Sequence, residues 1–235
     1  PTTACLLQHR LGLPVTCGAL DFNLGCSGFV YGLGLAKGLI ETGQAKNVLL
    51  LTAETYSKHI EASDKNVRTL FGDAATATWV QGVDDSLERL GSFVYGTDGS
   101  GAKNLIVEAG AMRKPGGEGD PYLRMDGPAI FTFTLKAVPA AVQALLTKSG
   151  LAMEQIDLFV FHQANVFMLE SLRKKIKIPQ EKFVYALRDF GNTVSSTIPI
   201  ALVEAERAGR LEKGMTVMLV GFGVGLSWGA CLIRW

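Results

Sequence analysis

The sequence predicts an α/β fold made of layered halves, in which helices cover mostly parallel sheets on both faces. Two observations support this prediction. Apolar runs of strand length alternate with longer segments that repeat apolar residues at helical spacing. The order of these elements is also similar in the two halves of the chain, which indicates a weak internal duplication in element order rather than in residue identity.

Helical spacing, apolar runs and glycine boundaries define the elements of the first half. The apolar run at 47–53 suits a strand covered on both faces, which gives a β-α-β unit with the run before it. Asp84-Asp85 marks a seam between a domain of residues 1–84 and one of residues 85–235. In order, we expect a helix over 2–11, a strand over 17–24, a helix over 27–42, a strand over 47–53, a polar loop over 55–68 and a strand of small residues over 71–80.

The second half alternates in the same way. After its first strand comes a long segment, residues 96–127, that is rich in glycine and in charged residues. We interpret this segment as a functional loop rather than a helix or strand. In order, we expect a strand over 87–95, the loop over 96–127, a helix over 129–149, a strand over 156–161, a helix over 164–176, a strand over 183–186, a helix over 193–208 and strands over 215–221 and 226–233.

Composition favours a well-cored globular chain and argues against several classes of partner. Of its 235 residues, 48% are hydrophobic and 19% are charged. The 23 basic and 22 acidic residues give a net charge of +1, so we expect no nucleic-acid partner. The apolar runs are shorter than the roughly 18 to 20 residues of a membrane span, and the N-terminal residues have no signal pattern. We therefore expect a cytoplasmic protein that does not bind a membrane.

The cysteines and histidines argue against a metal centre and a disulfide framework. The four cysteines are scattered without Cys-x-x-Cys spacing, and three histidines are too few for a histidine-rich site. We expect reduced thiols and no metal. The cysteines are residues 5, 17, 26 and 231, and the histidines are His9, His59 and His162.

Cys26 stands where an apolar run stops and a helical pattern begins. The unpaired N–H groups and the positive dipole end of a helix start favour a thiolate, so we expect a nucleophile with a lowered pKa. Gly25 and Gly28 permit a sharp turn and a close backbone approach beside it. The alternative is a small buried residue with a structural role, since free cysteine is among the most buried residue types.

Two other polar side chains stand at the same kind of edge. His162 follows a buried apolar run and precedes a helical pattern, which places it at the carboxyl end of a strand, where open α/β sheets bind ligands. Asn192 stands behind Gly191 at the start of another helix. A satisfied core histidine and a simple helix N-cap are the alternatives. The coincidence of three such positions favours a single site.

Four motifs together resemble the β-ketoacyl-acyl-carrier-protein synthase III family of the thiolase-like condensing enzymes. They are Gly25-Cys-Ser-Gly-Phe29, His162-Gln-Ala-Asn165, Gly191-Asn-Thr193 and the sequence GFGVGLSWG at 221–229, and the resemblance runs in order along the whole chain. It implies duplicated thiolase-like α-β-α layers with mostly parallel five-stranded sheets. The first half would be incomplete and carry the nucleophile, and the second would carry the histidine and the asparagine.

The resemblance also implies a reaction. Cys26 would take an acyl group from acyl-coenzyme A, and His162 with Asn192 would hold the carbonyl oxygen of the malonyl thioester while carbon dioxide leaves. The resulting carbanion would attack the Cys26 thioester and give a 3-ketoacyl product on the acyl carrier protein. Phe222 would face the departing carboxylate, and the N–H of Cys26 with one from the Val224 loop would hold the oxyanion of the acyl step. Coenzyme A and phosphopantetheine thioesters enter as substrates, and no cofactor is implied.

The sequence departs from the family at three places. Val224 interrupts a run of glycines and crowds the site, which puts the acyl-chain preference in doubt. Val166-Phe167 stands where many members carry an arginine for the carrier or for coenzyme A. An opening segment of roughly 90 residues is absent, so the chain looks like a fragment whose exposed sheet would be poorly stable alone. The candidate substrate- or carrier-binding residues are Lys65, Arg68, Asn165, Arg173 and Lys174, although a solvated helix face is the simpler interpretation of the last two.

Two other functions compete with a condensing enzyme. Cys, His and Asn occur in this order in papain-like hydrolases, and the 136 residues between Cys26 and His162 fall in the range of about 130 to 150 typical of that family. Papain-like enzymes carry a tryptophan after the nucleophile, however, where this chain has Ser27. The other possibilities are a non-decarboxylating acyltransferase and a non-catalytic scaffold fragment. A two-fold homodimer that continues the sheet through residues 47–53 is expected from the superfamily.

Overall fold

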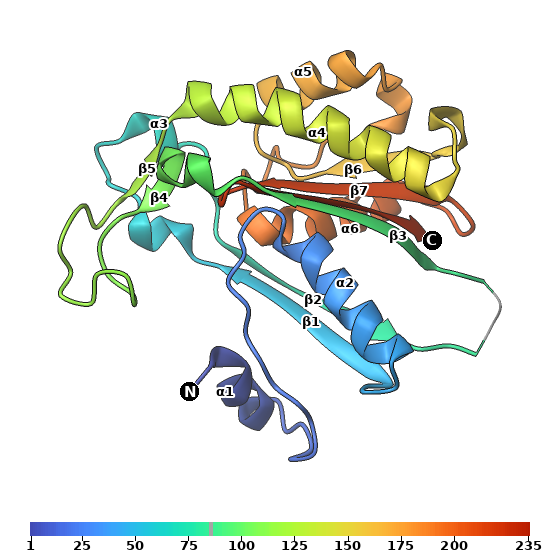
Figure 1. Cartoon of the computed structure of the whole chain (residues 1–235), viewed down its shortest axis with the longest axis horizontal. Coiled ribbons are helices and arrows are strands. Elements are labelled where there is room, and N and C mark those ends of the chain that lie inside the picture. The colour runs from blue at the N-terminus through green and yellow to red at the C-terminus, as the bar shows by residue number, and fades with distance from the viewer. Residues whose placement is uncertain (85–86) are drawn as a thin grey trace.

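The computed structural model describes residues 1–84 and 87–235, and its elements stack in layers (Figure 1). Helices α4 (Gly127–Ser149) and α5 (Val166–Ile176) cover one face of a four-stranded sheet. Helices α2 (Gly28–Glu41) and α6 (Thr197–Arg207) lie on the other face and separate this sheet from a two-stranded ribbon. The layered α/β class is therefore confirmed. The division at the seam stays a prediction, because Asp85 lies outside the described residues.

The main sheet has the order β3-β8-β7-β6 and is mostly antiparallel. Only β6 and β7 run parallel, so the expected parallel five-stranded sheet is wrong. A short turn joins β7 to β8, and such a connection forces antiparallel pairing. The strands are β3 (Leu90–Thr97), β6 (Leu158–Phe161), β7 (Thr216–Gly223) and β8 (Ser227–Arg234).

The expected strand over 183–186 is reduced to a single parallel bridge between Phe159 and Phe183. The side chain of Gln163 takes the place of a strand partner. Its amide donates to the Val184 carbonyl at 3.3 Å, and its Oε1 accepts the Ala186 N–H at 2.8 Å. These backbone groups are satisfied by a side chain, so the ladder does not continue.

The first half contains one antiparallel ribbon of β1 (Asn47–Glu54) and β2 (Ala74–Gln81). The expected strand over 17–24 is wrong, because this segment is extended, mostly exposed and without a strand partner among the described residues. The carboxylate of Asp21 instead accepts the first N–H groups of α1 (Thr3–Arg10), at 2.7 and 2.8 Å. The expected β-α-β unit therefore lacks its first strand. Strand β1 is also not covered on both faces, since Leu51 is exposed.

Both segments expected as loops contain short regular elements. Residues 55–68 include a 3₁₀ turn, η1 (Tyr56–His59), and helix α3 (Lys65–Arg68). Residues 96–127 include the 3₁₀ turn η2 (Gly99–Asn104) and a two-stranded hairpin of β4 (Leu105–Val107) and β5 (Leu123–Met125). The remaining 3₁₀ turns are η3 (Met153–Gln155), η4 (Gln180–Lys182) and η5 (Val194–Ser196).

Alternation along the central strands divides the core into two clusters, one on each face of the sheet. Phe159 and Met218 pack toward α4 and α5, whereas Val160 and Leu219 pack toward α2 and α6. Helix α4 is long and apolar enough to cross a membrane by length and composition alone. It packs against β3, β7 and β8, however, and a buried core helix has the same composition.

Candidate active site

Three segments far apart in the sequence meet at one edge of the main sheet. The turn before α2 carries Cys26, the end of β6 carries His162, and the segment before α6 carries Asn192. All three side chains are buried. Phe222, at the end of β7, packs against His162. Val194 contacts both His162 and Asn192 through its backbone.

Cys26 is 5% exposed and lies under the end of β7. Burial raises the pKa of its thiol to about 12, although hydrogen bonds from the Val224 N–H and its own N–H act in the opposite direction. The charge of Glu54 raises the thiol pKa further. The expected lowered pKa is therefore wrong, because desolvation outweighs the donors at the helix start. At neutral pH the Cys26 side chain is therefore a thiol.

Glycines let the β7 loop approach the nucleophile closely. A Cβ on Gly223 would lie 2.7 Å from the Cys26 sulfur, and a Cβ on Gly25 would lie 2.5 Å from the Val224 side chain. The hydroxyls of Ser27 and Ser227 also meet at 2.7 Å. The nucleophile turn is thus fixed to β7 and β8, and Val224 packs over the turn while its N–H faces the sulfur.

His162 is a neutral imidazole at neutral pH. Burial lowers its pKa to about 3, and a hydrogen bond with the Val194 backbone opposes this shift. Its Nδ1 lies 2.7 Å from the Thr197 hydroxyl oxygen, and the edge of its ring packs at 83° against Phe222, with centroids 5.4 Å apart. Because Nδ1 is engaged, Nε2 is the nitrogen that can meet a substrate.

Asn192 is held at both its backbone and its side chain. Its N–H donates to the Leu70 carbonyl at 2.9 Å, and its carbonyl accepts the Gly72 N–H at 3.0 Å. Its Oδ1 accepts the Val194 N–H at 3.0 Å, which leaves the NH₂ group to donate to a ligand. Val194 has a φ of 55°, a left-handed conformation that is rare for a β-branched residue and typical of strained functional sites.

The structure also brings residues to the nucleophile that the sequence analysis missed. Burial raises the pKa of both Glu54 and Tyr56, and the pKa of Tyr56 is raised further when the neighbouring Cys26 is a thiolate. The Ser195 hydroxyl donates to Glu54, which ties β1 to η5. Glu54 ends an apolar strand and Tyr56 follows it, and this position at a strand end is the only sequence signal that marks them.

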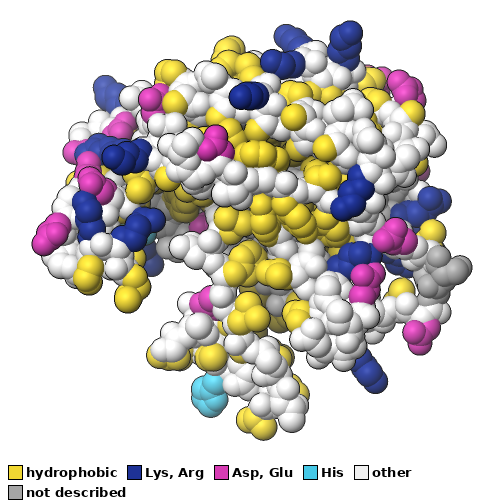
Figure 2. All heavy atoms as spheres, viewed as in Figure 1, with side chains coloured by type: hydrophobic (Ala, Val, Ile, Leu, Met, Phe, Trp, Pro, Cys, Tyr) yellow, Lys and Arg dark blue, Asp and Glu magenta, His cyan; other side chains and the backbone are white. Residues whose placement is uncertain are grey.

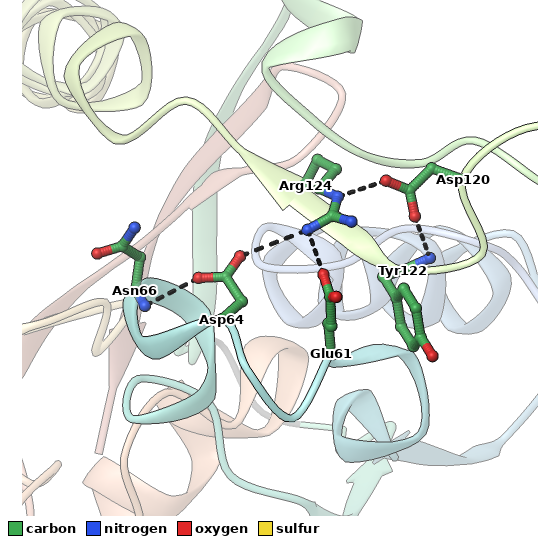
Figure 3. A network of polar contacts seen from close by, with 6 residues as sticks. All are labelled: Glu61, Asp64, Asn66, Asp120, Tyr122 and Arg124. Atoms are coloured by element: carbon green, nitrogen blue, oxygen red, sulfur yellow. Dashed lines mark hydrogen bonds and ion pairs between the residues drawn. The ribbon is translucent and has the colours of Figure 1, made fainter.

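Lys65 and Arg68 lie on α3, which an ionic cluster joins to the β5 hairpin (Figure 3). Arg124 of β5 reaches Glu61 at 2.7 Å and Asp64 at 3.8 Å, and it also pairs with Asp120. Asp64 caps α3 by accepting the Asn66 N–H. Lys65 is exposed, whereas the guanidinium of Arg68 donates to the Ala62 carbonyl at 2.8 Å. Lys65 is thus the more exposed of these two cations, and Arg68 is tied to its own loop.

The other candidate binding residues lie on or beside α5. Asn165 is the helix N-cap, since its Oδ1 accepts the Met168 N–H at 2.8 Å. Arg173 and Lys174 both pair with Glu170, at 3.0 and 3.5 Å. Phe167, in the first turn, is 71% exposed and stacks on Phe131 of α4 with centroids 5.3 Å apart. Figure 2 shows basic side chains at the surface over α5.

Among residues 1–84 and 87–235, no group of three His, Cys, Asp or Glu side chains is placed to hold a metal ion. Two hollows in this part of the chain lie away from Cys26, His162 and Asn192. One, of about 290 Å³, lies between β2 and α6 and is lined by apolar side chains that include Phe190 and Val203. The other lies around Tyr185 and Arg210. None of the three catalytic candidates lines either hollow.

Comparison with known families matches most of the chain. Residues 20–99 match the family described as 3-oxoacyl-[acyl-carrier-protein] synthase III, and residues 146–235 match the C-terminal region of the same enzymes. The chain is 40% identical over its whole length to a β-ketoacyl-[acyl-carrier-protein] synthase III of Caldanaerobacter subterraneus, of which it covers 72%. It is 39% identical to a relative of the same description from Bacillus cereus and covers 71% of it.

Solved structures agree with these sequence matches. One crystal structure of a 3-oxoacyl-(acyl-carrier-protein) synthase III is 55% identical and superposes with a TM-score of 0.97 over the whole chain, which covers 74% of that protein. The synthase III of Thermus thermophilus is 39% identical with a TM-score of 0.92, and the chain covers 73% of it. OleA of Xanthomonas campestris, at 22% identity and a TM-score of 0.83, shares the fold.

Proposed function

The chain belongs to the β-ketoacyl-acyl-carrier-protein synthase III family, and on that premise we propose that it condenses an acyl thioester with malonyl-acyl-carrier protein, with loss of carbon dioxide, in fatty acid biosynthesis. The observation that carries this proposal is the convergence on one buried edge of a thiol, a neutral imidazole and an oriented amide. Each is held by contacts that leave a reactive or donating atom available.

In the first half-reaction, the Cys26 sulfur attacks the carbonyl carbon of an acyl-coenzyme A. A carbon–sulfur bond to Cys26 forms, the bond to coenzyme A breaks, and the proton of the thiol ends on the coenzyme A sulfur. The N–H groups of Val224 and Cys26 face the sulfur and are suited to stabilise the negative charge that develops there and on the carbonyl oxygen. Because the thiol pKa is about 12, this step speeds up as the pH rises.

In the second half-reaction, malonyl-acyl-carrier protein loses its carboxylate as carbon dioxide. The electron pair of the broken carbon–carbon bond moves onto the thioester as an enolate, and Nε2–H of His162 and the NH₂ group of Asn192 donate to its oxygen. Phe222 packs against His162 and supplies an apolar wall that disfavours a charged carboxylate relative to neutral carbon dioxide.

The enolate carbon then attacks the Cys26 thioester. A new carbon–carbon bond forms, the bond to the Cys26 sulfur breaks, and the released thiolate takes up one proton from solvent. The product is 3-ketoacyl-acyl-carrier protein. The site performs this chemistry with hydrogen-bond donors, and the neutral state of His162 suits it to donate without adding a permanent charge.

Several parts of the proposal concern partners. Lys65 is assigned to the coenzyme A phosphates, with Arg68 beside it on α3, and Asn165, Arg173 and Lys174 are assigned to the carrier. A homodimer through β1 is supported by the outer edge of β1, which has no strand partner among the described residues. A location in the cytoplasm stays a prediction from the sequence.

The test uses the full-length protein with a short acyl-coenzyme A, followed by malonyl-acyl-carrier protein. We expect a stable acyl-enzyme that hydrolyses slowly in water, then equal amounts of carbon dioxide and 3-ketoacyl product once malonyl is added. Rapid hydrolysis without malonyl would instead identify a thioester hydrolase. Acyl transfer to the carrier without carbon dioxide would identify a plain acyltransferase, and absence of any acyl-enzyme would identify a scaffold.

A further inference from the structure

Two buried serines connect the residue after the nucleophile to the carbonyl of Val224. The hydroxyl oxygens of Ser27 and Ser227 lie 2.7 Å apart, and the Ser227 hydroxyl donates to the Val224 carbonyl at 2.7 Å. Ser27 is fully buried and Ser227 is 2% exposed. We propose that Ser227 is a positioning residue that directs the Val224 N–H at the oxygen of an acyl group on Cys26. The inference rests on the proposed function, because this oxygen becomes an oxyanion in its first half-reaction.

The direction of both hydrogen bonds follows from the groups involved. A backbone carbonyl can only accept, so the single hydroxyl hydrogen of Ser227 points at Val224. Ser227 therefore accepts the hydroxyl hydrogen of Ser27. We call this sequence of contacts, from Ser27 through Ser227 to the Val224 carbonyl, the serine relay. Because the relay has one direction, the loss of either hydroxyl has a predictable consequence.

Ser27 makes its contact in place of an ordinary helix cap. It is the N-cap residue of α2, where a serine side chain usually accepts a hydrogen bond from an N–H group in the first turn of the helix. The Ser27 side chain makes no such bond. Its hydroxyl contacts Ser227, the first residue of β8, instead. This hydroxyl therefore serves the contact between the nucleophile turn and the main sheet rather than the helix.

Val224 depends on the relay because both of its neighbours in the chain are glycines. Their φ values are 157° and 140°, which glycine adopts freely, so the backbone by itself does little to fix the loop. At one end of Val224, the N–H faces the Cys26 sulfur. At the other end, the carbonyl accepts from Ser227. Since Ser27 follows Cys26 directly, these contacts form a closed ring, and a change at the carbonyl alters where the N–H points.

Without the Ser227 hydroxyl, the Val224 carbonyl loses its donor. An unpaired carbonyl in a partly buried loop is unfavourable, so the loop turns until the carbonyl meets another donor or water. The Val224 N–H then moves away from the acyl oxygen. Acylation of Cys26 should be slower, because the negative charge of that step develops on this oxygen. Malonyl decarboxylation should continue, because its enolate is assigned to His162 and Asn192.

The experiment compares Ser227→Ala, Ser27→Ala and the double variant in the full-length protein, with Ser149→Ala as a matched control. The Ser149 hydroxyl also donates to the carbonyl three residues before it, that of Leu146, at 3.1 Å, but it lies at the end of α4. Acylation by a short acyl-coenzyme A and decarboxylation of malonyl are measured separately. The infrared carbonyl band of an isotope-labelled acyl-enzyme measures how strongly the N–H groups polarise that carbonyl.

We expect Ser227→Ala to lower the rate of acylation about 10- to 100-fold, while decarboxylation changes less than about threefold. The expected loss is smaller than the roughly 100- to 1,000-fold typical of deleting an oxyanion donor, because the N–H is misdirected and not removed. The carbonyl band of the acyl-enzyme should move toward that of a free thioester. The double variant should be no slower than Ser227→Ala, because both serines act through one carbonyl. Ser149→Ala should match the wild type.

Three results would overturn the inference. The first is acylation at the wild-type rate, or an unchanged carbonyl band, in Ser227→Ala. The second is an equal loss in both half-reactions, which would show a merely structural role. The third is a double variant whose loss is the product of the two single losses, which would show that Ser27 does not act through Ser227.

Alkylation of Cys26 by iodoacetamide needs no substrate, so it separates this inference from the proposed function. The Val224 N–H is one of the groups that favour the thiolate, so alkylation at about pH 9 should be about threefold slower in Ser227→Ala. This slowing supports the serine relay even if the protein releases no carbon dioxide from malonyl. If the wild type condenses normally and Ser227→Ala is alkylated at the wild-type rate, the proposed function is supported and the relay is contradicted.

Discussion

The strand pair β6–β7 and the ribbon β1–β2 have similar apolar sequences but opposite surroundings. Every residue of β6 is buried, with helices over both faces of its sheet. In the ribbon, Trp79 is 62% exposed. In the segment between α1 and α2, Val15 is 95% and Leu20 63% exposed. Figure 2 shows hydrophobic side chains at the surface around the α1 end, and a further group of them between α4 and α2.

The contrast between the two regions shows which one holds the three candidate residues in place. Cys26 belongs to the first half by sequence, yet its turn is fixed by Gly223, Val224 and Ser227 of the packed sheet. His162 lies at the end of β6 in the same sheet. The proposed catalytic cluster therefore depends on the packed region, whereas the ribbon presents surface that suits association with other polypeptide.

The largest effect should come from Cys26. Incubation of the full-length protein with a short acyl-coenzyme A should place the adduct on this residue alone, and Cys26→Ser should abolish condensation. Peptide mass mapping makes the measurement, with Cys17→Ser, in the open segment, as the control that keeps full activity. An adduct on Cys5 or Cys17 would show that solvent exposure decides which cysteine reacts. The packed contacts around Cys26 would then not explain its reactivity.

Truncating a side chain should lower the free energy of unfolding much more in the main sheet than in the ribbon. Phe159→Ala removes a fully buried ring and should lower the free energy of unfolding by about 3 to 5 kcal/mol. Trp79→Ala removes a larger but exposed ring and should change it by less than about 0.5 kcal/mol. Urea denaturation of the full-length protein measures both. A large loss in Trp79→Ala would mean that other polypeptide covers the ribbon in the native assembly.

Asn192 has two roles that different substitutions separate. Asn192→Asp keeps an oxygen for the Val194 N–H but loses the NH₂ donor, so decarboxylation should fall about 100- to 1,000-fold with little change in stability. Asn192→Ala should lose the same activity and also lower the melting temperature, because the strained Val194 is no longer held. Both variants should still be acylated on Cys26. Unchanged decarboxylation in Asn192→Asp would remove the amide from the mechanism.

The reactivity of Cys26 toward iodoacetamide should rise about tenfold per pH unit from pH 7 to pH 10. The reason is that a thiol with a pKa raised to about 12 gains thiolate in proportion to hydroxide over this whole range. Mass spectrometry at several pH values follows the alkylation of each cysteine. A plateau below pH 8 would show that the donors at the helix start outweigh burial after all.

The smallest effect concerns Phe167, where many relatives of this enzyme are expected to carry arginine. Phe167→Arg should lower KM for malonyl-acyl-carrier protein a few-fold, because it adds a cation beside the site that attracts an acidic carrier. The kcat and the rate of acylation by acyl-coenzyme A should stay unchanged. Trp79→Arg, at another exposed position away from α5, is the charge control. An equal effect in both variants would point to net charge instead of docking.

The sequence predicted the positions of helices and strands better than it predicted which strands pair with one another. Helices α2, α4 and α5 and the buried strands follow from local periodicity, and Cys26, His162 and Asn192 followed from their positions at element boundaries. Strand pairing is non-local, so neither the antiparallel sheet nor the missing strand over 17–24 could be predicted from apolar runs alone.

The electrostatic state of the site was also beyond the sequence. The helix start beside Cys26 is visible in the sequence, but the burial that outweighs it depends on the β7 loop, which is almost 200 residues away along the chain. Thr197 lies only five residues after Asn192, yet its contact with His162 requires α6 to pack beside β6. The sequence motifs indicate that such residues belong to one site, but they do not show which atoms are in contact.

The ionic cluster around Arg124 makes the contact between α3 and the β5 hairpin sensitive to the salt concentration of the buffer. Its side chains are partly exposed, so dissolved ions reach them, and the screening length falls from about 8 Å at 0.15 M salt to about 3 Å at 1 M. Concentrated salt would loosen the β5 hairpin from α3 and at the same time weaken the attraction of Lys65 for phosphate. Michaelis constants of variants are therefore comparable only when they are measured at one ionic strength.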